Sequence, residues 1–112
     1  MAESLFPVGS VHFGVTPTLW ANDDFPDIDI GIPFGQIISE AALAGFDGTS
    51  RGGKYPTDPK ILKPEMEMRG LVISEPWVST YFTIKDMYEE TLRNFDREIE
   101  FLLGMGTGDM VL

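Results

Sequence analysis

The chain of 112 residues contains no cysteine, which excludes disulfide bonds, thiolate metal sites and cysteine nucleophiles. Disulfide-free composition fits a reducing compartment. Basic residues are also scarce, with 8 Lys and Arg against 18 Asp and Glu, and the formal net charge is −10. Nucleic acids and anionic membrane surfaces are bound by clustered Lys and Arg, so we expect neither of them as a partner.

Long apolar runs are missing as well. No stretch approaches the roughly 18 apolar residues that a membrane-spanning helix requires. The first residues also lack the basic and apolar regions of a secretory signal. We therefore expect a cytoplasmic protein, in which residues 1–10 form a loose leader and residues 11–112 form a single structured part.

What the sequence does contain is a regular alternation of strand and helix patterns. The apolar positions repeat with period two in the strands and with helical period in the helices. Asp58-Pro59 is a typical start of a helix, and Thr83 with Asp86 resembles a capping box. The expected strands are 11–19, 45–49, 71–74 and 109–112, and the expected helices begin at Pro33, Asp58 and Thr83 and end near Gly45, Gly70 and Gly104.

This order, β-α-β-α-β-α-β, implies a parallel sheet with right-handed crossovers. A doubly wound sheet usually carries a glycine-rich phosphate loop after its first strand, whereas here that loop is Trp20-Ala-Asn-Asp-Asp. We therefore predict an α/β fold, a (β/α) TIM-barrel fragment with parallel strands that makes up about half of a barrel of roughly 250 residues. Such a fragment leaves sheet edges open, and a homo-oligomer formed through these edges is a further expectation.

Ligands of such barrels sit at the carboxyl ends of the strands. Three loops follow predicted strands, at 20–24, 50–55 and 75–81, and each combines an aromatic residue with polar groups. Their coincidence at one end of the sheet predicts a binding site.

Five side chains in these loops are candidates for that site. The flat faces of Trp20 and Trp77 suit the C–H surface of a sugar or cyclitol, although either ring can instead plug the barrel mouth. Asn22 and Asp23 can accept hydrogen bonds from ligand hydroxyls, or they can cap a turn. Lys54 can bind a carbonyl or hydroxyl oxygen, or it can remain solvated.

The residues alone identify no catalytic group. His12, the single histidine, lies at the start of the first strand, where barrel residues serve stability. Glu75 has the chemistry of a base, but Pro76 beside it suggests a structural corner. No set of His, Asp and Glu has the spacing of metal ligands, and no nucleophile with its base can be assembled.

Several motifs resemble one enzyme family. They are Phe13-Gly-Val-Thr-Pro-Thr-Leu-Trp-Ala-Asn-Asp-Asp, Ile32-Pro-Phe, Glu40-Ala-Ala-Leu-Ala-Gly-Phe-Asp-Gly-Thr, Lys54-Tyr-Pro, Asp58-Pro, Leu62-Lys-Pro and Arg69-Gly-Leu. From about residue 12 onward the chain resembles the N-terminal part of the inosose (2-keto-myo-inositol) dehydratases. These belong to the xylose-isomerase-like TIM barrels, which also include sugar isomerases and epimerases.

The resemblance implies a lyase that removes water from 2-keto-myo-inositol by metal-assisted enolisation, with Mn²⁺ or Co²⁺ held by ligands outside these residues. It makes Trp20, Asn22, Asp23, Lys54 and Trp77 the substrate-binding candidates and implies that this portion alone is inactive. One departure stands at the end of the second strand, where the family tends to place an acidic residue and this chain has Ser50-Arg51. The alternatives are a sugar isomerase or epimerase of the same barrel superfamily and a non-catalytic half-barrel that self-associates.

Overall fold

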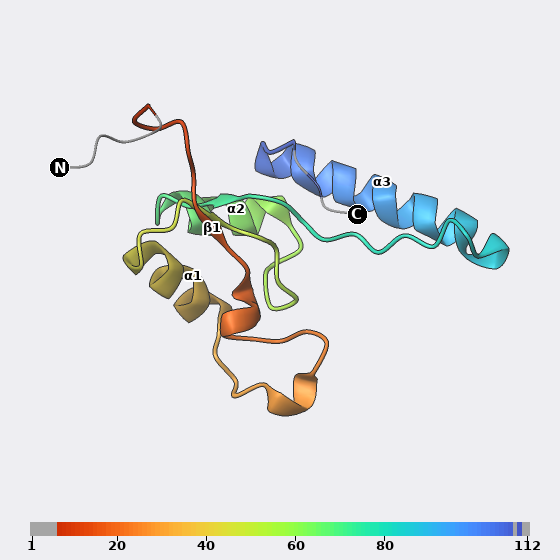
Figure 1. Cartoon of the computed structure of the whole chain (residues 1–112), viewed down its shortest axis with the longest axis horizontal. Coiled ribbons are helices and arrows are strands. Elements are labelled where there is room, and N and C mark those ends of the chain that lie inside the picture. The colour runs from red at the N-terminus through yellow and green to blue at the C-terminus, as the bar shows by residue number, and fades with distance from the viewer. Residues whose placement is uncertain (1–6, 109, 111–112) are drawn as a thin grey trace.

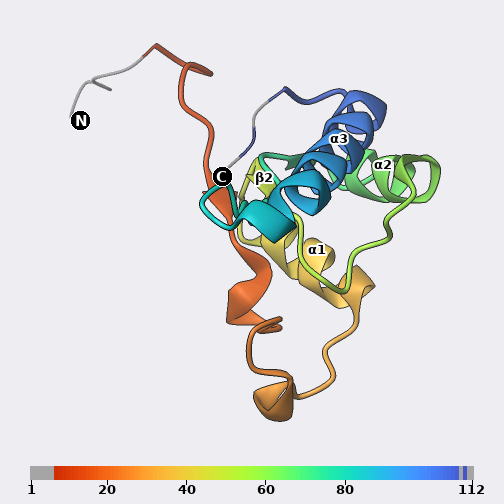
Figure 2. The same cartoon turned by 90° about the vertical axis from the view of Figure 1, so that its right-hand side faces the viewer.

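The computed structural model describes residues 7–108 and 110. Their core is a parallel sheet of three short strands in the order β1-β2-β3, with β1 at Gly14–Val15, β2 at Gly48–Thr49 and β3 at Val72–Ile73. Each strand is followed by a helix, α1 at Phe34–Leu43, α2 at Pro59–Glu67 and α3 at Tyr88–Met105. All three helices lie on the same side of the sheet (Figures 1 and 2). This arrangement of three consecutive β/α units confirms the predicted fold of a TIM-barrel fragment.

The strand register separates a covered side of the sheet from an open one. Thr49 of β2 pairs with Ile73 of β3, and these two side chains are 0% and 2% exposed. Their neighbours Gly48 and Val72 pair on the opposite side, where Val72 is 59% exposed. A Cβ atom on Gly48 would lie 2.7 Å from the carbonyl oxygen of Val72, so a larger residue does not fit there. Since side chains alternate along a strand, the helices cover only one face of the sheet.

The core lies between the covered face and the helices. It is formed mainly by aliphatic and aromatic side chains from all three β/α units. A hydrogen bond of 3.0 Å between the Thr49 hydroxyl and the Tyr55 hydroxyl crosses this core. Burial raises the pKa of Tyr55, and the bond to Thr49 offsets part of that effect. The buried hydrophobic members of the cluster are Ala21, Ile37, Ile38, Ala41, Tyr55, Leu62, Met66, Leu71, Ile73 and Phe101.

The starts of the first two helices agree with the sequence. Pro33 precedes the first residue of α1, and the Asp58 side chain caps α2 by accepting from the backbone N–H of Lys60 at 2.9 Å. Gly45 and Gly70 follow the ends of α1 and α2 with φ values of 87° and 68°. These are left-handed conformations in which glycine is the least strained residue. Pro64 lies inside α2, which continues through it.

The strands are shorter than predicted. The first was expected over residues 11–19, but β1 covers only Gly14–Val15, and Pro17–Leu19 forms a 3₁₀ helix. Pro17 has no N–H to donate to a neighbouring strand, and its fixed φ suits the first position of a helical turn. The predicted second and third strands shrink to Gly48–Thr49 and Val72–Ile73. The strand predicted at 109–112 lies outside the described residues.

The limits predicted for the third helix are wrong at both ends. Thr83 caps nothing, because Ile84 is extended and Lys85–Met87 forms a 3₁₀ turn before α3 begins. At the other end the helix passes through Gly104 and stops at Gly106, which has a φ of 79°. The α3 residues that are buried are Thr91, Phe101 and Leu102.

Candidate functional site

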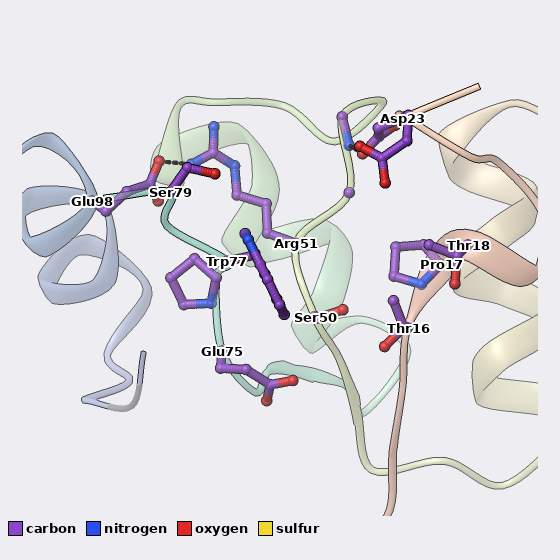
Figure 3. A pocket seen from close by; sticks show the side chains of 14 residues that line it. Thr16, Pro17, Thr18, Asp23, Ser50, Arg51, Glu75, Trp77, Ser79 and Glu98 are labelled. Atoms are coloured by element: carbon purple, nitrogen blue, oxygen red, sulfur yellow. Dashed lines mark hydrogen bonds and ion pairs between the residues drawn. The ribbon is translucent and has the colours of Figure 1, made fainter. Parts of the chain in front are cut away.

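The three loops that follow the strands meet in one open pocket of about 640 Å³ (Figure 3). Thr16 to Thr18 and Asp23 come from the segment after β1, Ser50 to Gly53 from the segment after β2, and Glu75 to Ser79 from the segment after β3. Glu98 of α3 closes one side. The sequence-based expectation that these loops converge at the carboxyl end of the sheet is therefore met.

Asp23 and Trp77 are the two predicted site residues that line this pocket. A carboxylate oxygen of Asp23 accepts a hydrogen bond of 2.7 Å from the backbone N–H of Gly53, and its other oxygen makes no hydrogen bond among the described residues. The close contact explains why residue 53 is glycine, since a Cβ atom there would lie 2.6 Å from that other oxygen. Trp77 is 73% exposed and presents its indole across the pocket from Asp23 (Figure 3).

Trp20 points elsewhere. Its indole N–H donates to a carboxylate oxygen of Glu40 on α1 at 2.5 Å, and the ring packs against the core. Gln36 donates to the other oxygen of Glu40 at 2.7 Å. These two hydrogen bonds stabilise the ionised carboxylate and hold the pKa of Glu40 below its usual range. The ring thus fastens the start of the long loop after β1 to α1.

Lys54 and Asn22 also make their hydrogen bonds within the protein. The Lys54 ammonium lies 2.6 Å from Asp29 Oδ2 and donates to the Ile32 carbonyl oxygen at 2.9 Å. The bond from Lys54 and one from the Gly31 backbone N–H hold the pKa of Asp29 below its usual range. Asn22 accepts from the backbone N–H of Asp24 at 3.0 Å, which is an Asx-turn. Neither Lys54 nor Asn22 lines the pocket.

Sequence reasoning missed one prominent feature of the pocket, an ion pair between Arg51 and Glu98. Nη1 of Arg51 donates to both carboxylate oxygens of Glu98, at 2.6 and 2.8 Å. The guanidinium carbon also lies 4.5 Å from the centroid of the Phe101 ring, in the geometry of a cation–π contact. The one sequence signal was that Arg51 departs from the acidic residue usual in the resembled family. Nothing in the sequence pattern pointed to its partner Glu98, which lies 47 residues further along the chain.

The remaining chemistry-bearing residues are few. Glu75 lines the pocket, and its carbonyl oxygen accepts from the backbone N–H of Arg51 at 3.3 Å. His12 lies at the opposite end of β1, with Nδ1 3.8 Å from Asp47. Within residues 7–108 and 110, no three His, Asp or Glu side chains are grouped so that they can hold a metal ion. The described residues by themselves therefore do not supply the ligands of a metal site.

The relatives found by comparison with known proteins are inosose dehydratases. Over 108 residues, the chain is 45% identical to inosose dehydratase of Clostridium botulinum strain Alaska E43 and 41% identical to that of Bacillus anthracis. Each match covers 96% of this chain. The chain is homologous to the inosose dehydratases. It spans 36% of the length of these inosose dehydratase relatives, and no protein-family model matches it.

A solved structure supports the fold. The protein described as AP endonuclease, family 2, from Brucella melitensis superposes with a TM-score of 0.65, covering 88% of this chain and 39% of that one. The two sequences are 15% identical, so this likeness concerns the fold alone. The likeness supports the assignment of this chain as a TIM-barrel fragment. No helix in the described part of this inosose dehydratase homologue is long and apolar enough to cross a membrane.

Proposed function

We propose that this chain forms one wall of the substrate pocket of an inosose dehydratase-like lyase, which removes water from 2-keto-myo-inositol. The observation that carries the proposal is the convergence of the loops of all three β/α units on one pocket. The homology to inosose dehydratases supports this reading. The cytoplasmic location and the boundary between leader and barrel at residues 10 and 11 remain predictions.

The pocket residues suit a hydroxylated ring. The exposed Trp77 indole offers a flat apolar face on which the C–H surface of a cyclitol can stack. The free oxygen of Asp23 and the carboxylates of Asp24 and Glu75 offer acceptors for ring hydroxyls. Because the Gly53 N–H holds Asp23, this carboxylate is oriented before the substrate arrives.

Dehydration of a cyclitol ketone requires loss of a proton next to the carbonyl and loss of the β-hydroxyl as water. We assign the described residues to binding and orientation, and none of them to these proton transfers. A divalent ion such as Mn²⁺ or Co²⁺, which the family resemblance implies, would need ligands from outside the described residues. The proposal therefore includes the prediction that the isolated 112-residue chain does not turn over the substrate.

Complementation tests this proposal. The chain would be co-expressed with the remaining part of the Clostridium botulinum inosose dehydratase, and loss of 2-keto-myo-inositol would be followed by NMR. We expect turnover from the pair and none from either part alone. Trp77→Ala in the active pair should raise KM about two- to tenfold, since aromatic stacking on a ring contributes about 0.5–1.5 kcal/mol.

The matched control is Phe82→Ala, which removes another exposed aromatic side chain from the same connection but outside the pocket. It should leave KM unchanged. Turnover by the isolated, metal-supplemented chain would contradict the assignment to binding only. Equal effects of the two alanine variants would contradict the role of Trp77.

A further inference from the structure

A second pocket, of about 540 Å³, lies beside the strand-end pocket. The two pockets share Arg51, Trp77, Ser79 and Glu98 in their walls. Figure 3 shows the pair formed by Arg51 and Glu98 at this boundary, with Ser79 next to it. The polar residues of the second pocket are Arg51, Thr57, Ser79, Asn94, Arg97 and Glu98.

The two pockets differ in charge. The strand-end pocket is lined by four carboxylates, from Asp23, Asp24, Glu75 and Glu98, and by one arginine. The second pocket has two arginines and a single carboxylate, that of Glu98. Both oxygens of this carboxylate accept hydrogen bonds from Arg51.

Arg97 therefore supplies an uncompensated positive charge to the second pocket. None of the ion pairs among residues 7–108 and 110 involves Arg97, and its Nη2 donates to the neutral amide oxygen of Asn94. A local excess of positive charge is unusual on a chain with a net charge of −10. Charges at a concave surface are more effective than charges at a flat one, because the low-dielectric walls focus the field.

The walls of the second pocket also contain several hydrogen-bond donors that an anion can use. Arg51 is held in place by Glu98 and by the Phe101 ring, and its side chain is 22% exposed. Nη1 of Arg51 donates both hydrogen bonds to Glu98. The guanidinium carries further N–H donors on Nε and Nη2, which these two bonds do not use. The Thr57 and Ser79 hydroxyls and the Asn94 side-chain N–H₂ add neutral donors to the same walls.

We propose that this second pocket binds a small oxyanion of the phosphate class between Arg51 and Arg97. Guanidinium groups recognise phosphate oxygens through paired N–H donors, and a tetrahedral anion can accept from several walls at once. The pocket has room for more than the ion itself, so the phosphate can be free or attached to a small organic group. This proposal does not rest on the proposed dehydratase activity, although the two pockets share part of their walls.

Binding of inorganic phosphate to the purified full chain tests the proposal. Isothermal titration calorimetry gives the Kd, and amide shifts in NMR spectra report on Thr57, Ser79 and Arg97. Ionic strength should be low and matched with chloride, because salt screens such contacts. We expect Arg97→Gln to weaken binding about tenfold or more, the loss that one charge-assisted hydrogen bond represents.

Arg93→Gln is the matched control, since it makes the same substitution one turn earlier on α3 at an exposed residue that does not line the pocket. It should leave the Kd within about twofold of the original value, as expected for a screened distant charge. Asn94→Asp is a second variant that keeps both arginines and adds a negative charge to the pocket, and it should abolish binding. Circular dichroism confirms that each variant remains folded.

A hexose phosphate titrated in parallel distinguishes the two sources of the anion. Tighter binding than inorganic phosphate would indicate a phosphorylated small molecule, and equal or weaker binding would indicate the free ion. In either case the affinity must fall in the Arg97→Gln variant. The proposal is overturned if phosphate does not bind, if Arg97→Gln and Arg93→Gln weaken binding equally, or if Asn94→Asp binds phosphate as well as the original chain.

Discussion

Several polar residues next to the pocket hold the protein itself together. Trp20 and Lys54 fasten the two ends of the loop after β1, through Glu40 in one case and through Asp29 in the other. Asp23 fastens the middle of the connection to Gly53 in the loop after β2. Three side chains that sequence reasoning selects for ligand contact therefore position the backbone around the site.

The Lys54–Asp29 pair leads to a prediction about pH. The pKa of the Asp29 carboxyl is lowered in the fold, so the stability it contributes is present above the ordinary aspartate value of about 3.9 and is lost as pH falls through the lowered pKa. Lys54→Met should raise the Asp29 pKa toward the ordinary value, as measured by carbon-detected NMR titration. Lys60→Met, which removes a lysine with no part in this pair, should leave the Asp29 pKa low. An unchanged Asp29 titration in the Lys54 variant would refute the assignment.

A second prediction concerns the buried hydroxyl pair in the core. Tyr55→Phe removes one hydroxyl and leaves the Thr49 hydroxyl, which is 0% exposed, without its partner. We expect a loss of about 1–3 kcal/mol in the free energy of unfolding. Replacing both residues, as Thr49→Val with Tyr55→Phe, removes both polar groups and should restore most of that stability. Urea unfolding of the two single variants and the double variant measures the coupling, and strict additivity would show that the hydroxyls do not interact.

At the scale of elements, some local signals predicted where a helix begins, whereas contacts between distant parts of the chain could not be predicted. Asp58-Pro59 marks the start of α2 because the cap and the proline act within one turn. Thr83 failed as a cap because its neighbour Ile84 adopts an extended backbone and the chain first makes a 3₁₀ turn. The contact between Arg51 and Glu98 depends on where α3 lies against the loop after β2, which no local pattern encodes.

The packing of α3 against α2 predicts the effect of a glycine substitution. Gly104 lies inside α3, where alanine normally stabilises a helix by about 1 kcal/mol. Here a Cβ atom would lie 2.6 Å from Cγ of Pro59, the first residue of α2. Gly104→Ala should therefore destabilise the fold by about 1–3 kcal/mol, the usual cost of overpacking.

Gly35→Ala in α1 provides the comparison, because its Cβ atom would meet no heavy atom within 4 Å. It should be neutral or stabilising by up to about 1 kcal/mol. Chemical denaturation of both variants measures the difference. If Gly104→Ala were as stable as Gly35→Ala, the close approach of the two helices at Pro59 would be wrong.

At the scale of the whole molecule, the sheet formed by residues 7–108 and 110 has one uncovered face, and no strand of this part of the chain pairs with the outer edge of β1 or β3. Val72 of β3 is 59% exposed on this face, whereas Ile73 beside it is 2% exposed. The radius of gyration is 16.0 Å, against about 13 Å for a compact domain of about 100 residues. Parallel sheets are normally covered on both faces, so this surface is suited to association. The candidates are the rest of a barrel and a second copy of the chain.

Association through this surface gives the last prediction. A partner that binds only the folded chain raises its stability in proportion to the logarithm of the partner concentration, by about 2.7 kcal/mol at one hundred times the Kd. Adding the remaining part of an inosose dehydratase homologue should therefore raise the Tm of the chain in a concentration-dependent way. Val72→Lys, which places a charge on the uncovered face, should abolish this rise, whereas Met68→Lys at an exposed position just beyond α2 should not. A Tm that depends on the concentration of the chain alone, and not on the added part, would instead favour self-association of two copies.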